Sequence, residues 1–382
     1  MWLAKNRTAF FGLLAALLMP ALVSAATIET IANPLRGRVS DFSNVGNRAA
    51  EFLTIPVGAR GLAMGNAFIA QADDISAIYW NPAGLGFLEG PQAFFSHLDM
   101  PLGFSIDYTA AAYPMLDGKL ILGGFFGIMN IAPEEITTVE SPEGTGAFYD
   151  GYSTQFGATM AFNFSDRFSA GVSVKGIRES IFQITSNAMA FDMGTNYHTE
   201  LFDRPIRLSF TINNLGTNMQ FKGDNLFLQV RPQELYSDPL QDGASNRMFN
   251  RDNRNAFYST SKFYLPTSFQ GGLAMDPYST SDMRWTLAAQ FSENNYMPSS
   301  FAVGTELARS VNARFTAALR WGWNIERDEV DLSGSDQMRG MSWGGGIECN
   351  VLKNMGIAVD YAYRDMGRLT NNQVFTLMWK MM

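Results

Sequence analysis

The chain of 382 residues has little of what enzymes use for catalysis: one cysteine, Cys349, and two histidines, His97 and His198. A single cysteine cannot form an intrachain disulfide, and Cys349 lies within an alternating pattern typical of a strand. Neither histidine belongs to a metal-spaced motif, and no Gly-x-Ser-x-Gly segment is present. Both histidines fall near predicted strand ends, where a solvated side chain is expected. We therefore predict a protein that is not an enzyme and that binds no cofactor or metal.

Long hydrophobic runs are also missing beyond the first 25 residues, which excludes a later membrane helix of roughly 18–20 apolar residues. At the start of the chain, Lys5 and Arg7 precede an apolar run over 9–23, and small residues follow at 23–26. This is the pattern of a signal peptide with its cleavage site. We predict a signal peptide over 1–25 and export of the remainder, with an amino-terminal membrane helix as the alternative. No cysteine stands at the cleavage site, which excludes a lipoprotein.

Charge is scarce and acidic: charged residues make up 17% of the chain, and its net charge is −8. An acidic exported protein is not expected to bind nucleic acid. The locally basic run 246–255 is interpreted as an outer loop that faces anionic lipid or a protein partner. The run 331–336 resembles part of a calcium loop but lacks the glutamate that ends such loops, so a solvated loop is expected there.

What the sequence does contain is a ladder of alternating segments from about residue 92 to its end. In 206–213 apolar residues alternate with polar ones, and 314–323 repeats the pattern. Alternation indicates strands, because successive side chains leave opposite faces of the pleat. In a soluble sandwich the apolar face fills a core, whereas in a transmembrane barrel it meets lipid. Alternation alone does not decide between the two.

The number of strands and the lengths of their connections favour the barrel. We predict about fourteen strands, most with roughly the 9–11 residues that a tilted strand needs to cross a bilayer. Connections after even strands are short and rich in turn residues, while several after odd strands are long, notably 133–150, 215–263 and 325–339. Outer-membrane barrels sort their periplasmic turns and extracellular loops in this way. The predicted strands lie near 92–98, 104–114, 119–129, 152–164, 168–179, 187–198, 205–213, 264–275, 283–292, 299–307, 312–324, 340–350, 355–365 and 372–380.

The fold class predicted is therefore all-β: an antiparallel up-and-down transmembrane barrel over 91–382, with an exported sandwich as the alternative and twelve or sixteen strands left open. In 357–364 we expect odd positions to face lipid and even positions to face the lumen. Aromatic residues such as Trp343 and Tyr363 are expected in the interfacial girdles. The charged side chains predicted to point inward are Lys175, Arg314, Arg320 and Asp360.

Residues 26–90 do not alternate, and their most distinctive stretch is 58–85. It contains Gly58, Ala59, Arg60, Met64, Gly65, Ala67, Phe68, Ala72, Asp73, Asp74, Asn81, Pro82, Ala83 and Gly84. With these residues the sequence resembles the PorV/PorQ family, a branch of the FadL-like outer-membrane barrels. The resemblance implies that 26–90 is a plug, or hatch, inside the barrel. It also implies either uptake of hydrophobic molecules or, as for PorV, type IX secretion with secreted cargo and other secretion proteins as partners.

Physical reasoning agrees that the lumen of such a barrel needs filling, because fourteen strands enclose more space than their own side chains occupy. The small residues of 58–70 allow close packing against a barrel wall. Asp73 or Asp74 can cap a short helix after them. Asn81 and Pro82 end that helix, and the sequence leaves open whether this turn also shapes a passage.

Two functions follow from these observations. The long loop at 215–263 mixes charged with apolar residues, and the predicted lumen carries charges, so the main prediction is a secretion component that docks cargo or partner proteins. The alternative is a FadL-like passive transporter of hydrophobic small molecules. Either protein lies in the outer membrane of a Gram-negative-type bacterium, with lipid around it, loops outside and turns in the periplasm.

Overall fold

The computed structural model describes residues 48–230, 254–295, 299–312, 314–326, 340–352, 354–367 and 370–381. The predicted signal peptide and the loop 331–336 lie outside these residues, as does most of the basic run 246–255. The predicted segment 26–90 is described from Arg48 onward.

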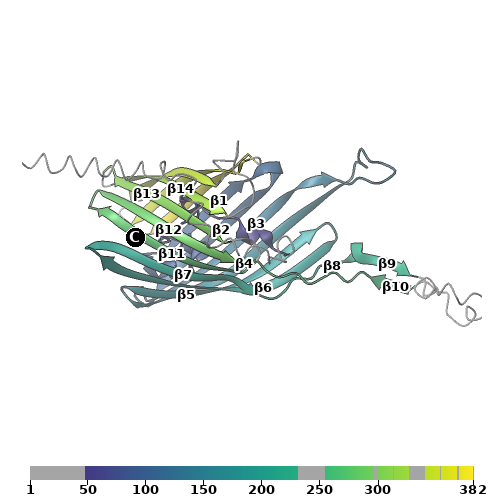
Figure 1. The fold of residues 1–382 in the computed structure, drawn as a ribbon, viewed down its shortest axis with the longest axis horizontal. Helices are drawn as coiled ribbons and strands as arrows, with labels where there is room; N and C mark the ends of the chain where they lie inside the picture. Colours follow the sequence, from purple (N-terminus) through teal and green to yellow (C-terminus); the bar gives the residue numbers. More distant parts are fainter. Residues whose placement is uncertain are drawn as a thin grey trace, which may run out of the picture. The chain divides into compact units, whose positions relative to one another are not determined.

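Within the described residues, fourteen antiparallel strands form one closed sheet (Figure 1). Each strand pairs with its neighbours in the chain, and β1 pairs with β17, which joins the first strand to the last. This confirms the predicted up-and-down barrel and its strand number. The strands are β1 (Gln92–Asp99), β2 (Ser105–Met115), β3 (Leu120–Glu135), β4 (Phe148–Ser165), β5 (Phe168–Ile181), β6 (Ile184–Leu201), β7 (Arg204–Gly216), β11 (Ser268–Ser279), β12 (Met283–Asn294), β13 (Ser300–Ser310), β14 (Phe315–Glu326), β15 (Met341–Leu352), β16 (Met355–Asp365) and β17 (Asn371–Met381).

One predicted strand, 264–275, is displaced in the structure, where β11 begins at Ser268. Pro266 has no N–H to donate to a ladder, so the regular strand starts after it. The residues just before it form isolated bridges instead, between Tyr264 and Arg48 and between Phe263 and Met219.

The connections differ between the two ends of the barrel. At one end, the short-turn end, they are 116–119, 166–167, 202–203, 280–282, 311–314 and 353–354. At the other, the long-connection end, they are 100–104, 136–147, 182–183, 217–267, 295–299, 327–340 and 366–370. The predicted sorting by parity is present for the long connections, since 136–147, 217–267 and 327–340 all lie at one end, where 100–104, 182–183, 295–299 and 366–370 are short. Positive φ angles at Phe202 (52°) and Asp203 (57°) are those of a type I′ turn, whose twist matches the strands that it joins.

The long connection 217–267 contains short elements of its own. These are β8 (Lys222–Gly223), which pairs with β6, the 3₁₀ helix η6 (Asp224–Leu226), and the hairpin of β9 (Phe227–Val230) and β10 (Arg254–Phe257). A further 3₁₀ helix, η5 (Pro101–Gly103), lies between β1 and β2.

Apolar side chains cover the outer face of the barrel, and its interior holds polar side chains together with alanines and apolar residues that pack on the N-terminal segment. Leu319, Ile347 and Val359 are 69%, 60% and 52% exposed, while Ser209 and Thr211 are buried. In β16 exposure alternates as predicted, with the even positions buried. No helix among the described residues is long and apolar enough to cross a membrane. The exposed apolar side chains make the outer face suited to contact with lipid chains.

Three of the four predicted inward charges are confirmed: Lys175, Arg320 and Asp360 have side chains at most 8% exposed. Arg314 was predicted wrongly. It lies before β14, in the connection 311–314, and is exposed there. The predicted strand 312–324 began inside the connection that precedes β14, and side chains in a connection do not follow the alternation of a strand.

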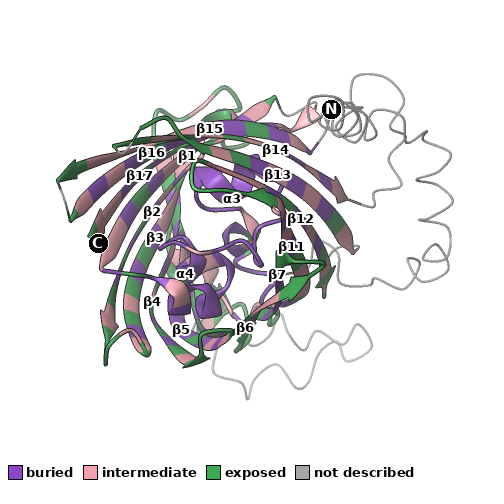
Figure 2. Ribbon diagram, turned by 90° about the vertical axis from the view of Figure 1, so that its left-hand side faces the viewer, coloured by how far each residue is buried: buried purple, intermediate pink, exposed green. Residues whose placement is uncertain are grey.

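The described part of the N-terminal segment, residues 48–90, lies within the ring of strands (Figure 2). We call it the luminal segment. Its elements are the helices α3 (Ala59–Ala63) and α4 (Ala77–Trp80) and the 3₁₀ helices η3 (Glu51–Thr54) and η4 (Pro82–Phe87). Most of its apolar residues belong to a buried cluster that also includes inward residues of the strands.

Candidate functional site

The luminal segment makes hydrogen bonds and close contacts with strands all around the barrel. Near β1 and β17, the backbone N–H groups of Gly58 and Ala59 donate to Ser96 Oγ (3.2 Å) and Thr376 Oγ1 (2.9 Å). On the other side, the N–H of Phe68 donates to Gln290 Oε1 of β12 (3.1 Å). These donors belong to turns and short helix ends, which leave backbone groups unpaired. Inward serine, threonine and glutamine side chains of the barrel accept from them.

Gly65 shows why this segment needs glycine at one point. Its φ is +65°, and a Cβ placed on it would overlap the backbone of Trp323 in β14. Glycine adopts this conformation without a Cβ penalty and lets two backbones touch. Met64 and Gly65 rest directly on Gly322 of the same strand. The predicted close packing of 58–70 against the barrel wall is therefore present at this position.

Arg60 anchors the segment through a buried ionic network. Its guanidinium donates to both carboxylate oxygens of Glu306 in β13, at 2.8 and 2.9 Å. It also pairs with Asp73 (2.5 Å) and Asp74 (2.6 Å) of the luminal segment itself. The network continues along the wall. Its further pairs are Arg284 with Asp73 and Glu306, Arg320 with Glu306, and Arg320 with Asp360.

Within this network, the charged forms of Asp73 and Arg60 are favoured by their partners. Burial alone would raise the pKa of Asp73, but the guanidinium groups of Arg60 and Arg284 outweigh it, so this pKa lies well below its usual range. Burial also disfavours the cation of Arg60, and the carboxylates of Asp73, Glu306 and Asp74 reverse that effect and raise its pKa. Removing one member of such a buried network is strongly destabilising, because it leaves an uncompensated charge. The motif residues Arg60, Asp73 and Asp74 thus form one unit.

The predicted cap of α4 by Asp73 or Asp74 is not formed, and Asp74 instead holds the turn that precedes the helix. Its Oδ1 accepts the backbone N–H of Ser76 at 2.8 Å, directly before α4. Ser76 itself occupies the N-cap position and makes no side-chain cap. Asp73 takes part in the ion pairs only.

Asn81 and Pro82 end α4 as predicted and also tie it to the barrel. Asn81 Oδ1 accepts the N–H of Ala83 at 3.1 Å, and its amide donates to the carbonyls of Ile69 (3.0 Å) and Thr195 (3.3 Å) in β6. Ser169 of β5 donates to the carbonyl of Ala83 at 2.8 Å. A Cβ on Gly84 would overlap the carbonyl oxygen of Ala72, so the turn at 81–84 packs directly on residue 72.

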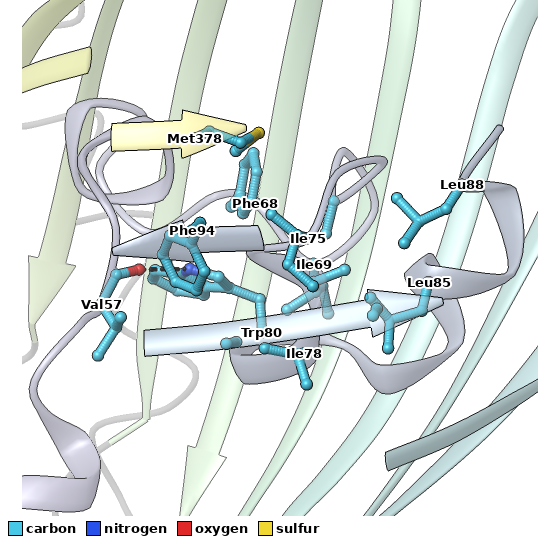
Figure 3. Packing of buried hydrophobic residues seen from close by; sticks show 14 of the residues in the cluster. Val57, Phe68, Ile69, Ile75, Ile78, Trp80, Leu85, Leu88, Phe94 and Met378 are labelled. Carbon is cyan, nitrogen blue, oxygen red and sulfur yellow. Dashed lines mark hydrogen bonds between the residues drawn. The ribbon is translucent and has the colours of Figure 1, made fainter. Parts of the chain in front are cut away.

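Apolar side chains of the luminal segment converge between these anchors (Figure 3). The Trp80 ring contacts Phe68 edge to face, with centroids 5.7 Å apart. Its Nε1 donates to the carbonyl of Val57 at 2.9 Å, which satisfies the one polar atom of the ring. Ile69, Ile75, Ile78 and Leu85 are at most 2% exposed around this pair. The segment therefore has a core of its own that is completed by the barrel wall.

A cavity of about 770 Å³ lies at the long-connection end of the lumen, beside the luminal segment. Its size is that of small-molecule sites. The luminal segment and the connection 100–104 contribute mostly apolar lining residues: Phe52, Leu53, Ile55, Tyr79, Trp80 and Phe104, with the polar Arg48, Glu51, Thr54 and Asn66 among them. The strands contribute mostly polar lining residues: Lys175, Asn213, Asn214, Gln270, Gln290, Ser292, Asn294, Asn324, Arg364 and Asn372.

The two histidines lie apart from this cavity. His97, on the outer side of β1, contacts Asp107 Oδ1 at 2.7 Å and Asp99 Oδ1 at 3.2 Å, and its side chain is 36% exposed. His198, which was expected to be solvated, stacks on Phe87 of η4 with ring centroids 3.9 Å apart. The described residues contain no group of His, Cys, Asp and Glu that could hold a metal ion.

Sequence reasoning missed the barrel half of the ionic network, Glu306 and Arg284. Alternation within β12 and β13 could have placed both on the inner face. Nothing in the sequence pairs them with Arg60, because the contact joins residues more than 200 positions apart. The polar lining residues of the cavity were missed for the same reason.

Comparisons with known proteins bear on the fold. No family model matches the chain, and no curated protein matches its sequence. The Pseudomonas putida toluene transporter TodX matches with 10% identity and a TM-score of 0.51, over 84% of this chain and 96% of its own. The Ralstonia pickettii toluene transporter TbuX matches with 12% identity and a TM-score of 0.50, over 85% of this chain and 98% of its own. The fold is FadL-like.

A third match, the monoaromatic hydrocarbon channel CymD, has 10% identity and a TM-score of 0.51, and covers 85% of this chain and 97% of its own. These structures support a FadL-like outer-membrane-type barrel. They do not support the narrower assignment to PorV/PorQ or a role in type IX secretion.

Proposed function

We propose that this protein is a passive outer-membrane transporter for hydrophobic small molecules. The observation that carries the proposal is the cavity of about 770 Å³ inside a FadL-like barrel, to which the luminal segment contributes mostly apolar lining residues. Apolar lining beside polar groups is the usual composition of a site that binds and orients a small ligand. In fold the chain resembles TodX and TbuX, which are toluene transporters.

In this proposal the luminal segment is a plug. Its support is the ring of contacts to β1, β17, β12, β6 and β5 described above, together with its own buried core. A barrel of fourteen strands without such a filling is wide enough to be a channel. A ligand in the cavity therefore lies against the plug and passes only when the segment shifts.

We further propose that the long-connection end faces the outside of the cell and the short turns face the periplasm. The signal peptide predicted over 1–25 and the apolar outer face support export to the outer membrane. The short-turn and long-connection ends have the asymmetry that such barrels share.

A secretion component is the second candidate, and one observation favours it. The described parts of the long connection 217–267 expose aromatic residues: Phe257 is 62% exposed and Tyr258 is 67% exposed. Exposed aromatic side chains on a long loop suit a protein-docking surface. The matched structures give this candidate no support.

Uptake of a fluorescent hydrophobic tracer by whole cells tests the transporter. Ser292 lines the cavity and Glu293, the next residue, faces outward near the end of β12. Ser292→Trp should fill the cavity and reduce uptake severalfold, whereas Glu293→Trp should leave uptake unchanged, because an outward aromatic at a strand end is tolerated. Equal uptake by both variants and by cells without the protein would overturn the proposal.

Shortening the long connection 217–267 distinguishes a secretion component from a transporter. Removing 224–257 keeps the base of the connection, where Met219 pairs with Phe263 and Gln220 donates to the carbonyl of Thr260. A transporter should then keep normal release of secreted proteins. Blocked release at normal barrel levels, with tracer uptake unchanged, would favour the secretion component instead.

A further inference from the structure

A pocket opens on the barrel wall at the long-connection end, where the connection 217–267 leaves β7. β6 pairs with Gly216 at Ala190 and with Lys222 of β8 at Thr185 (Figure 1). Between these two pairs, the edge of β6 and the base of the connection enclose a volume of about 700 Å³. We call it the outer pocket. It shares no lining residue with the cavity in the lumen.

Lys222 lies on the outer face of the barrel. In β6 the odd positions from 187 to 191 are exposed and the even positions are buried. Thr185 continues the odd set, and Lys222 is its direct partner in the ladder. Directly paired residues of neighbouring strands share one face of the sheet, so Lys222 leaves the outer face together with Asn187.

Lys262 lies on the same face. Met219 forms a bridge with Phe263 across the base of the connection and is buried in a cluster with residues of the luminal segment. Gln220 and Lys262 follow and precede this bridge, so their side chains alternate with it and leave the outer face. Among the residues that the structure describes, neither Lys222 nor Lys262 pairs with a carboxylate.

The lining of the outer pocket is polar and carries positive charge only. Besides the two lysines and Gly216, it consists of Thr185, Ser186, Asn187, Thr217, Asn218 and Gln220. This stands out in a chain whose net charge is −8. Ammonium groups attract an anion, and hydroxyl and amide groups can both donate to and accept from sugar hydroxyls. The volume is also that of a site for a molecule larger than a phosphate ion.

Apolar surface begins directly next to the pocket on the same strands. Met189 and Phe191 of β6 and Leu215 of β7 are 55%, 43% and 47% exposed on the outer face. On a barrel in a membrane, the change from apolar to polar side chains along a strand marks the level at which hydrocarbon gives way to headgroups. A lipid whose chains cover the apolar residues therefore has its headgroup at the outer pocket.

We propose that the outer pocket binds the phosphorylated sugar headgroup of a glycolipid, with a phosphate between Lys222 and Lys262 and the acyl chains against Met189, Phe191 and Leu215. A free sugar phosphate would meet the lysines but would gain nothing from the apolar residues. A lipid bound in this way connects the base of the connection 217–267 to the membrane. The site lies outside the lumen and is additional to the proposed transport.

Native mass spectrometry of the purified full-length protein in detergent tests this, because it counts bound lipids directly. The probes are diphosphoryl lipid A and the same lipid with its phosphates removed. Both have the same sugars and acyl chains, so only the phosphates differ. We expect the phosphorylated lipid to bind about three- to tenfold more tightly, as two exposed ion pairs allow.

Substitutions localise the effect. Lys222→Gln combined with Lys262→Gln should reduce the preference for the phosphorylated lipid to near one. Lys119→Gln combined with Arg309→Gln is the matched control, because both residues are exposed toward the short-turn end and the same charge is removed. This control should keep the preference. The comparison of the two lipids on the unaltered protein holds even if the lysine variant fails to fold.

Glucosamine 1-phosphate, a soluble sugar phosphate without acyl chains, distinguishes the two sources of such a headgroup. At an equal concentration it should not displace diphosphoryl lipid A, and displacement would overturn the lipid in favour of a free sugar phosphate. Equal binding of the two lipids would also overturn the proposal, as would binding of neither. A preference that survives the lysine substitutions would place the phosphate elsewhere on the protein and overturn this site.

Discussion

At the scale of residues, the inside and the outside of this barrel follow opposite rules. Inside, Arg60 and Glu306 are buried charges and Asp73 is a partly buried one, and they are tolerated because each meets partners of the opposite sign. Outside, Val359 stands next to Ile347 and Leu377 in register, and all three are at least half exposed to the surroundings of the barrel. Water would disfavour such an apolar outer patch, and hydrocarbon favours it.

The ionic network predicts that the stability of the folded protein decreases at low pH. Since the pKa of Asp73 is lowered in the folded protein, its stabilising contribution is present above the ordinary carboxylate pKa of about 4 and is lost as pH falls below it. Asp73→Asn should cost about 1.5–3 kcal/mol at neutral pH, the contribution of a hydrogen bond to a charged partner. It should also flatten the acid dependence below about pH 4.

Chemical denaturation between pH 7 and pH 3 measures both effects. Asp117→Asn, in an exposed short turn, is the matched control and should behave like the unaltered protein. Identical pH profiles for the Asp73 variant and the unaltered protein would show that Asp73 does not anchor the segment.

If the outer face meets lipid, an arginine on it should destabilise the barrel by an amount that depends on its depth in the membrane. Val359 lies in the middle of β16, whereas Leu352 ends β15 and is 64% exposed. Val359→Arg should destabilise the barrel by about 2–4 kcal/mol and Leu352→Arg by about 0–1 kcal/mol. Urea unfolding in lipid vesicles, followed by tryptophan fluorescence, compares the two. Equal penalties would mean that the middle of β16 does not lie at the centre of the bilayer.

At the scale of elements, the strands could be predicted from alternation, whereas the luminal position of 48–90 was implied only by the family resemblance and its contacts could not be predicted. A period of two fixes both the strand and its face, which is why the faces of 357–364 are correct. The luminal segment has no period, and its short helices depend on contacts with distant strands. Between β6 and β7, Asp192 faces both Asn213 and Asn214 in a β-bulge. Alternation could not predict this bulge, because an inserted residue breaks the period of two. The tie between Arg60 and Glu306 is set by the closed barrel alone.

The luminal segment can be tested as a unit by deleting 58–85. The ladder hydrogen bonds of the barrel run between strands, so we expect a folded barrel with a water-filled lumen. Exposed charges such as Glu306 and Arg320 would then be solvated rather than buried. The deleted protein should conduct ions in planar bilayers, while the intact protein stays nearly closed. A silent deletion variant would argue against the plug.

A single substitution gives a milder form of the same test. Gly65→Val places a side chain against the backbone of Trp323 and should unseat the segment, so we expect intermittent conductance. Gly124→Val lies on the outer side of β3, where the nearest atom to an added Cβ is 3.7 Å away, and should stay closed. Equal conductance for the two variants would show that the contact of Gly65 does not seat the segment.

At the scale of the whole molecule, the barrel has two unlike ends. The cavity and the bulge lie at the long-connection end, while the anchors of Asn81 and Pro82 lie toward the short turns. A ligand that enters from the long-connection end therefore meets the cavity before the plug. This order suits uptake from outside the cell, and it depends on the orientation of the barrel in the membrane.

Site-specific labelling tests that orientation. Cys349 is the only cysteine of the chain, so Cys349→Ser gives a background without thiols. In it, Val139→Cys places a thiol in the connection 136–147, at a position 95% exposed, and Asp166→Cys places one in a short turn. A membrane-impermeant maleimide should label the first on intact cells and the second only after the outer membrane is permeabilised. The reverse pattern would invert the barrel, and protection of both sites on intact cells would place it in another membrane.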